Sequence, residues 1–167
     1  MVGSEPMGDV TVRWATVDDV EGLVRLRRVM FDAMAIDVPD DAEQAMRSTI
    51  AAGLATSDLF AAVVDDEGTG RVVACGVGMI SQRIAGPHNL SGRYGYVQSM
   101  VTDEAYRGRG LARAVLELLM ARFAADGVVR VDLHATELGA PLYRSMGFTE
   151  GAQPELRWSG VARNACE

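Results

Sequence analysis

The segment from Val97 to Met120 (VQSMVTDEAYRGRGLARAVLELLM) constrains the fold more than any other part of the chain. It predicts the end of an apolar strand, a short acidic turn, a loop of arginine and glycine, and an amphipathic helix. Glycine lets a backbone approach a ligand closely, and the first turn of a helix presents unpaired N–H groups to an anion. The segment therefore predicts a strand–loop–helix unit that binds a phosphate-bearing cofactor.

The size and charge of the chain restrict what kind of protein it is. Its 167 residues suit a single domain, which buries about 70% of the surface that the unfolded chain exposes. The formal net charge of −7, from 16 basic and 23 acidic residues, argues against a nucleic acid as the main partner. All of the basic residues are arginines, which excludes a Schiff-base lysine and a P-loop lysine.

The cysteines and the hydrophobic pattern indicate a cytoplasmic protein. Cys75 lies in a predicted strand and Cys166 in the C-terminal tail, which gives neither a disulfide framework nor a metal-ligand spacing. The first residues lack the basic and apolar regions of a signal peptide, and no apolar run approaches ~20 residues. We therefore expect no membrane span and no metal site.

The order of apolar patterns predicts an α/β protein of the α+β kind, with one mixed sheet and helices on both faces. We expect the order β-α-α-β-β-β-α-β-α-β-β, with strands at 10–14, 59–64, 71–82, 93–101, 128–133, 148–150 and 155–159, and helices at 16–34, 42–55, 111–126 and 141–146. Strands 59–64, 71–82 and 93–101 form an antiparallel meander, and the strand at 128–133 returns parallel to 93–101 by a right-handed crossover. Residues 1–8 and 161–167 are expected to be tails, and residues 9–160 a single domain.

Two motifs within this order resemble those of the GNAT superfamily of acyl-CoA-dependent N-acyltransferases. The loop Arg107 to Ala112 (RGRGLA) follows the family pattern of Arg or Gln, two residues, Gly, one residue, and Gly or Ala. The segment Leu142 to Phe148 (LYRSMGF) places a tyrosine a few residues before Gly-Phe, as the family does. A Rossmann dinucleotide site is the competing interpretation of the loop, but Arg113 stands where its third glycine should be.

The resemblance implies a binding site for acetyl-CoA. The pyrophosphate would lie against backbone N–H groups of the loop, where the helix dipole contributes about 0.3–1 kcal/mol and three nearby arginines add positive potential. Backbone groups of the preceding strand would hold the pantetheine arm, and one of those amides would polarise the thioester carbonyl. The residues expected to bind the cofactor are Met100, Val101, Arg107, Gly108, Arg109, Gly110, Leu111, Ala112, Arg113, Thr136 and Tyr143.

The resemblance also implies catalytic residues. Tyr143 would protonate the departing thiolate, although a tyrosine that only packs in the core is the alternative. Many family members carry a glutamate on the strand before the loop, but residues 93–100 contain no carboxylate. Tyr96, Gln98 and Met100 are predicted to share one strand face, where Gln98 or Tyr96 would hold a water that takes the amine proton. His134 is the other candidate for the base.

The acceptor should lie between the first pair of helices and the strand at 93–101. The acidic residues Asp32, Asp37, Asp40 and Asp41 would suit a cationic amine, and a solvated polar loop explains them equally well. We expect direct attack by a small-molecule amine in a ternary complex, with no membrane partner. A protein N-terminus or lysine as acceptor, and an acyl-CoA-binding module without activity, remain the alternatives. The oligomeric state, a homodimer included, stays open.

Overall fold

The computed structural model describes residues 11–151, 155–158 and 160. The chain divides into two compact units, of which the first ends at His134 and the second begins at Ala135. The tails predicted at residues 1–8 and 161–167 lie outside the described residues, and the single domain over residues 9–160 stays a prediction. Among the described residues, no helix combines the length and apolar character that a bilayer span needs.

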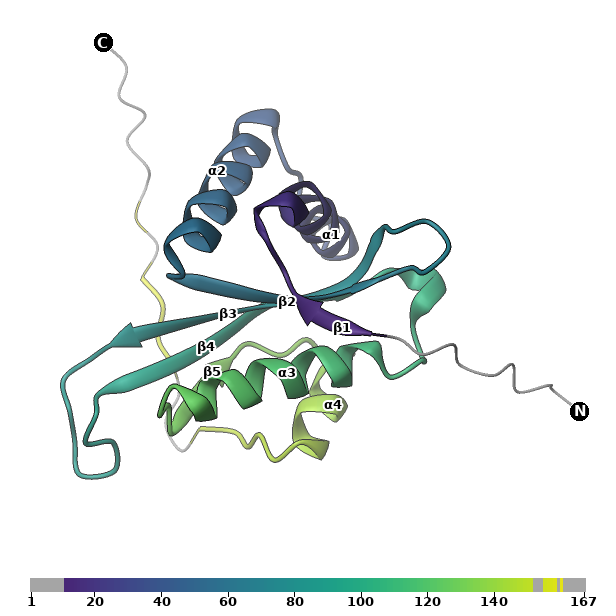
Figure 1. The fold of residues 1–167 in the computed structure, drawn as a ribbon. Coiled ribbons are helices and arrows are strands. Elements are labelled where there is room, and N and C mark those ends of the chain that lie inside the picture. Colours follow the sequence, from purple (N-terminus) through teal and green to yellow (C-terminus); the bar gives the residue numbers. More distant parts are fainter. Residues whose placement is uncertain (1–10, 152–154, 159, 161–167) are drawn as a thin grey trace, which may run out of the picture. The chain divides into compact units, whose positions relative to one another are not determined.

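The first unit is built on a five-stranded mixed sheet (Figure 1). Neighbouring strands follow the order β1-β2-β3-β4-β5; the first four pair antiparallel, and β5 runs parallel to β4. The elements are β1 (Val12–Trp14), η1 (Val17–Asp19), α1 (Val20–Ala33), α2 (Asp40–Thr56), β2 (Leu59–Asp65), β3 (Val72–Gln82), β4 (Arg93–Thr102), η2 (Glu104–Tyr106), α3 (Leu111–Ala125) and β5 (Arg130–Leu133). The predicted meander and the parallel return strand are both confirmed.

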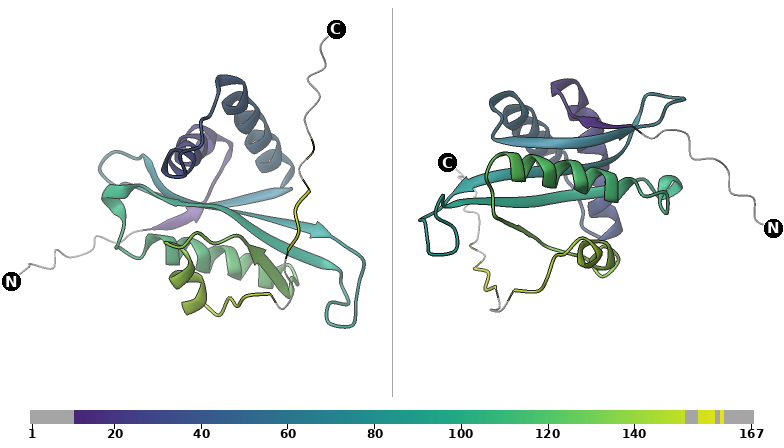
Figure 2. Two further views of the ribbon diagram at one scale, coloured as in Figure 1. Left: turned by 180° about the vertical axis from the view of Figure 1, so that it is seen from behind. Right: turned by 60° about the horizontal axis from the view of Figure 1, so that its bottom comes forward.

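Helices cover both faces of this sheet. Helices α1 and α2 lie on one face and α3 on the other (Figure 1), and the reverse view shows the same layers (Figure 2). Beneath α1 and α2, apolar side chains from both helices and the sheet form a continuous core. Its buried members are Val20, Leu23, Val24, Leu26, Ile50, Leu59, Ala61, Val63, Val72, Cys75, Val77 and Val101.

Glycines in the central strands let α3 lie close to the opposite face. A Cβ added at Gly76 would come within 2.8 Å of Val115 Cγ1, and one at Gly95 within 2.7 Å of Phe123 Cε1. Both α3 side chains are fully buried. Gly76 of β3 and Gly95 of β4 therefore provide room for the helix, which begins beside the glycine loop.

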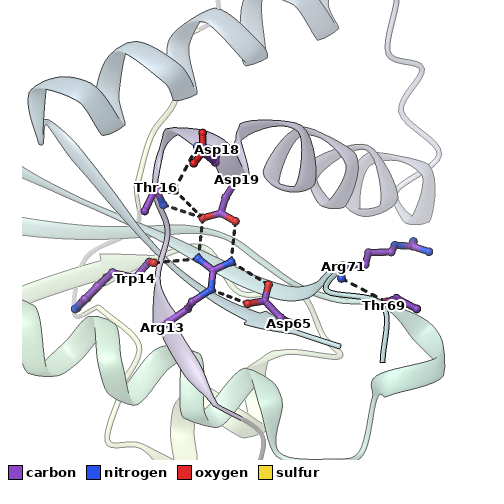
Figure 3. Close-up of polar contacts among 8 residues, drawn as sticks. All are labelled: Arg13, Trp14, Thr16, Asp18, Asp19, Asp65, Thr69 and Arg71. Atoms are coloured by element: carbon purple, nitrogen blue, oxygen red, sulfur yellow. Dashed lines mark hydrogen bonds and ion pairs between the residues drawn. The ribbon is translucent and has the colours of Figure 1, made fainter. Parts of the chain in front are cut away.

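An ion-pair network fixes the short edge strand β1 (Figure 3). Arg13 donates from Nε to Asp65 Oδ2 at 2.6 Å, and from Nη1 and Nη2 to the two Asp19 oxygens at 2.8 Å each. Asp19 also accepts from the Thr16 amide at 2.8 Å, and the Thr16 hydroxyl accepts from the Asp18 amide at 3.3 Å. A capping box of Thr16 and Asp19 is thus present, and it connects β1 to the start of the first helical segment.

The described part of the second unit contains one helix, α4 (Ala140–Ser145). Gly147 follows it with φ +92°, a conformation that favours glycine. The predicted final hairpin is wrong over the described residues, because 148–150 and 155–158 form no strand; Ser159 lies outside them. Leu156 and Trp158, the apolar side chains of the second segment, are exposed, so no buried face stabilises a strand there.

Candidate functional site

Strand β4 contains a β-bulge near its C-terminal end. Cys75 of β3 pairs with Val101 and Val77 pairs with Gln98, so β4 has two residues where β3 has one. One of those two, Ser99, has φ +54°, in the left-handed region that non-glycine residues seldom adopt. A bulge disrupts the local ladder and redirects side chains, and bulges are common beside active sites.

The bulge changes which side chains share a face. Gln98 pairs with Val77, whose side chain lies in the core under α1 and α2, and Tyr96 lies two residues earlier on the same face. The Met100 sulfur instead lies against Gly76, on the α3 face. The prediction that Tyr96, Gln98 and Met100 share a face is therefore wrong for Met100, since regular alternation stops at the bulge.

Beyond the bulge, β4 has an open edge. Strand β5 pairs with β4 only from Tyr94 to Val97, so within the described sheet the rest of β4 has no strand on that side. Met100 and Val101, which were predicted to offer backbone groups to a pantetheine arm, lie in this part of the strand. An extended ligand can add to such an edge as a further strand would.

The loop before α3 has the backbone geometry of an anion site. Gly108 has φ +75° and Gly110 has φ +78°. Gly110 is the N-cap of α3, no side chain caps the helix, and its first turn contains no acidic residue. Leu111 is buried and anchors the helix start. The first N–H groups of α3, at Leu111 and Ala112, therefore lie where an anion can accept from them.

Three arginines lie in and beside this loop, and all are exposed. Arg107 Nε donates to the Thr102 carbonyl at 3.2 Å, and Arg109 Nη2 donates to the Ala105 carbonyl at 3.1 Å. The Arg109 guanidinium also lies 5.1 Å from the centre of the Tyr106 ring. Within the described residues, neither Arg107 nor Arg109 pairs with a carboxylate, so their positive charge is not neutralised there; Arg113 lies one turn into the helix.

The structure brings together Tyr96 and His134, two residues predicted to take part in removing the amine proton. The Tyr96 hydroxyl and His134 Nδ1 share a hydrogen bond of 2.5 Å, and their ring centroids lie 5.9 Å apart. His134 follows β5 directly, and Tyr96 pairs with Asp132 in the neighbouring strand. Gln98 lies on the same face of β4, with its amide nitrogen 3.6 Å from the Met79 sulfur.

Tyr143 has a buried ring on α4. The ring packs edge-on against Phe148, with centroids 6.0 Å apart, and close to Gly139. Its hydroxyl makes no hydrogen bond to any described residue. Burial raises the pKa of Tyr143 above its ordinary value, so that the hydroxyl keeps its proton at neutral pH.

Thr136 has a local structural role ahead of α4. Its hydroxyl accepts from the Gly139 amide at 3.2 Å, and its carbonyl accepts from the Ala140 amide at 2.9 Å. These bonds form the turn that starts the helix. The contact between Thr136 and a cofactor stays a prediction.

Sequence reasoning missed Arg27 and Ser99. Arg27 of α1 donates from Nη1 to the Ser99 hydroxyl at the bulge, and its guanidinium lies 5.1 Å from the centre of the Phe31 ring. Burial lowers the pKa of Arg27 below its ordinary value. The cluster Arg25, Arg27 and Arg28 is visible in the sequence, but no local signal distinguishes the member that reaches β4.

The four acidic residues at the end of α1, in the loop after it and at the start of α2 are all exposed: Asp32, Asp37, Asp40 and Asp41. Asp40 and Asp41 lie in the first turn of α2, where negative charge stabilises a helix start, and Asp41 accepts from the Ala42 amide at 2.8 Å. This local role favours the solvated-loop explanation for these two. The expectation that the loop attracts a cationic amine stays a prediction.

Cys75 does not have the properties of a nucleophile. It is buried, burial raises the pKa of its thiol to about 12, and the thiol donates to the Ser99 carbonyl at 3.4 Å. Within the described residues, no group of three His, Cys, Asp or Glu side chains is arranged to hold a metal ion.

The fold and the two motifs agree with a comparison against known families. Residues 56–150, which include parts of both units, match the acetyltransferase (GNAT) domain. The chain belongs to the GNAT acetyltransferase family, and the fold class predicted from the element order is confirmed.

Individual proteins are similar to the chain in sequence or in fold. Glucosamine 6-phosphate N-acetyltransferase 1 of Oryza sativa subsp. japonica is 31% identical over 94 residues, 56% of this chain and 55% of that protein. This chain thus spans about half the length of that relative. A GCN5-related N-acetyltransferase from Ralstonia eutropha JMP134 superposes with a TM-score of 0.77 at 29% identity, covering 90% of this chain and 99% of that one. A predicted acetyltransferase with acetyl-CoA from Clostridium acetobutylicum gives a TM-score of 0.80 at 23% identity, covering 89% and 96%.

Proposed function

We propose that the protein transfers an acetyl group from acetyl-CoA to a primary amine on a small molecule, by direct attack in a ternary complex. The observation that carries this proposal is one continuous arrangement from β4 to α3. A bulged strand with an open edge leads into a loop with two left-handed glycines and then into a helix without a side-chain cap. A long ligand with a thioester at one end and phosphates at the other matches this order.

Each part of acetyl-CoA has a partner in this proposal. The pyrophosphate accepts hydrogen bonds from N–H groups of residues 109–112, and the arginines of the loop add positive potential. The pantetheine arm lies along the open edge of β4, next to Met100 and Val101. An amide of these two residues polarises the thioester carbonyl, and such a donor contributes roughly 3 kcal/mol in other acyl transfers.

The chemistry then needs an acid and a base. The amine nitrogen attacks the thioester carbon, and the tetrahedral intermediate collapses with loss of the CoA thiolate. Tyr143 gives its proton to that thiolate, a role that its raised pKa supports because the hydroxyl is protonated at neutral pH. The hydrogen-bonded pair of Tyr96 and His134 accepts the amine proton. A water held by Gln98 is the alternative base.

The names of the relatives support a small-molecule amine as the acceptor. The matching rice protein is named for glucosamine 6-phosphate, a small amine. A protein N-terminus or a lysine side chain remains the alternative acceptor. A module that binds acyl-CoA without turnover is the alternative function, and the absence of a carboxylate on strand β4 favours it.

An assay of CoA release separates these functions. Free thiol is measured after the purified protein is mixed with acetyl-CoA and each member of a panel of small amines, peptides and lysine derivatives. We expect release with at least one small amine, and the N-acetylated product by mass spectrometry. Release with peptides only would assign a protein acceptor. Tight acetyl-CoA binding by calorimetry, without release for any amine, would establish the binding module instead.

A further inference from the structure

We infer that the acceptor carries an anionic group, a carboxylate or a phosphate, and that Arg27 binds this group beside the β4 bulge. The inference rests on the proposed function, because it concerns the second substrate of the same site. It differs from the sequence-based expectation, in which acidic residues between the first two helices attract a cationic amine.

The first argument is that Arg27 differs from the other arginines of α1. Arg25 forms an ion pair with Asp103 at 2.8 Å, and Arg28 forms one with Glu43. Within the described residues, Arg27 pairs with no carboxylate. Arginines one and two positions away are neutralised, so the missing partner at Arg27 is specific to this position and is not a property of the helix surface.

The second argument is the position of the guanidinium. Arg27 spans from α1 to β4 and donates to the hydroxyl of Ser99, the residue with the left-handed conformation in the bulge. In the proposed function, the thioester carbonyl lies against the backbone next to Ser99. In that arrangement, the Ser99 side chain lies between the Arg27 guanidinium and the backbone that contacts the thioester. The guanidinium is on the face of β4 that also carries Tyr96 and Gln98.

The third argument is electrostatic. The Arg27 side chain is partly buried, and burial lowers its pKa without any carboxylate to offset the effect. A partly desolvated guanidinium, which donates one hydrogen bond among the described residues, gains from a carboxylate or phosphate, because two oxygens of either group match its planar pair of N–H donors. The Phe31 ring at 5.1 Å supports the guanidinium but supplies no anion. An acceptor with an oxyanion a few bonds from its amine would complete this site.

Arg27 also has a structural role, and a test must separate that role from binding of the acceptor's anionic group. Its bond to Ser99 contributes to holding the bulge in place. If holding the bulge were its only role, Ser99→Ala and Arg27→Gln would have the same effect on the preference between the two amines of a pair, because each variant removes the same hydrogen bond. Recognition of an anion by Arg27 predicts that the two variants differ, since Ser99→Ala keeps the guanidinium.

The experiment uses pairs of amines that differ only in an anionic group. Suitable probes are glucosamine 6-phosphate with glucosamine, and phenylalanine with phenethylamine, assayed by CoA release. For the wild-type protein we expect at least a tenfold preference in kcat/KM for the anionic member of one pair. Arg27→Gln should reduce this preference to within threefold, chiefly through KM for the anionic amine, with unchanged acetyl-CoA affinity. Arg27→Lys should retain part of it.

Two variants serve as controls. Arg28→Gln removes the neighbouring arginine that pairs with Glu43 and should leave the preference unchanged. Ser99→Ala should also keep the preference. The inference is overturned if the wild-type protein acetylates these amines but favours neither anionic member, or if Arg27→Gln slows both members of a pair equally.

A binding measurement distinguishes failure of this inference from failure of the proposed function. Calorimetric titration of the CoA-saturated protein with the same pairs does not depend on turnover. Binding of the anionic amine alone, lost in Arg27→Gln, would support the anion site even if no CoA were released from acetyl-CoA. Equal binding of both members, or of neither, would contradict it.

Discussion

Tyr96 and His134 form one hydrogen-bonded pair across β4 and the end of β5. The sequence suggested Tyr96 as a residue that holds a water base and His134, separately, as the other candidate for the base. Their contact makes the two candidates a single unit, because a proton taken by one ring can be stabilised by the other. In the proposed function, this pair takes the role of the strand carboxylate that many family members carry.

Replacing either member of this pair should slow turnover. We expect Tyr96→Phe and His134→Ala each to lower kcat. The larger of the two decreases should be about 10²-fold, which is the low end of what a general base contributes. The double variant should lose little more than the worse single variant, because residues that act as a unit are not additive. Steady-state kcat at saturating acetyl-CoA checks this. If both variants keep wild-type kcat and Gln98→Ala does not, the water held by Gln98 is the base.

Tyr143→Phe tests the general acid. Phenylalanine keeps the ring that packs against Phe148 and removes only the hydroxyl, which makes no hydrogen bond to described residues. The variant should therefore fold, bind acetyl-CoA with wild-type affinity, and lose ~10²–10⁴ in kcat. Calorimetric affinity and kcat are measured on the same sample. An unchanged kcat would assign Tyr143 to packing alone.

Gly110→Ala tests the loop before α3. Alanine at φ +78° is strained by about 1–2 kcal/mol, and relief of the strain would turn the first N–H groups of α3 away from the pyrophosphate. We expect weaker acetyl-CoA binding by at least tenfold. Gly86→Ala, in the loop between β3 and β4, has open space around its Cβ and should leave binding unchanged. Equal affinities in the two variants would remove the loop from the cofactor site.

Asp19→Asn should destabilise the protein near neutral pH. Hydrogen bonds from Arg13 lower the pKa of the Asp19 carboxyl below its ordinary value, so this stabilisation is present above the unfolded pKa of ~3.9. It is lost as the pH falls through the lower folded pKa. Because the Arg13 side chain is 39% exposed, we expect only about 1–2 kcal/mol at pH 7.

The control for this prediction is Asp18→Asn, which changes the exposed neighbouring carboxylate. Urea unfolding at pH 7 and at progressively lower pH should show a difference between Asp19→Asn and wild type that shrinks in acid. A difference that is independent of pH, or an equal effect of Asp18→Asn, would show that the ion pair does not carry the stabilisation.

The sequence predicted those features that depend on local patterns. Alternation and helical periodicity located the sheet, the covering helices and the parallel return strand, and the two glycines located the loop before α3. The β4 bulge was not predictable, because its left-handed residue is Ser99 rather than glycine or asparagine, and regular alternation then put Met100 on the wrong face. The final hairpin was predicted from two short apolar patterns, which are weak signals for a strand.

The sequence also does not predict which residues pair with partners far away in the chain. Arg25 pairs with Asp103, 78 residues away, and Arg13 pairs with Asp65, 52 residues away, so the sequence does not say which arginines are neutralised. The role inferred for Arg27 follows from that difference and required the folded structure. The partnership of Tyr96 with His134 likewise depends on the parallel register of β4 and β5.

The most direct test of the central claim is a matrix of initial rates in which acetyl-CoA and an accepted amine are both varied. Direct attack in a ternary complex predicts double-reciprocal lines that intersect, and an intact mass that stays unchanged when the protein meets acetyl-CoA alone. Parallel lines together with an acetylated protein would show a covalent acyl-enzyme and contradict the account.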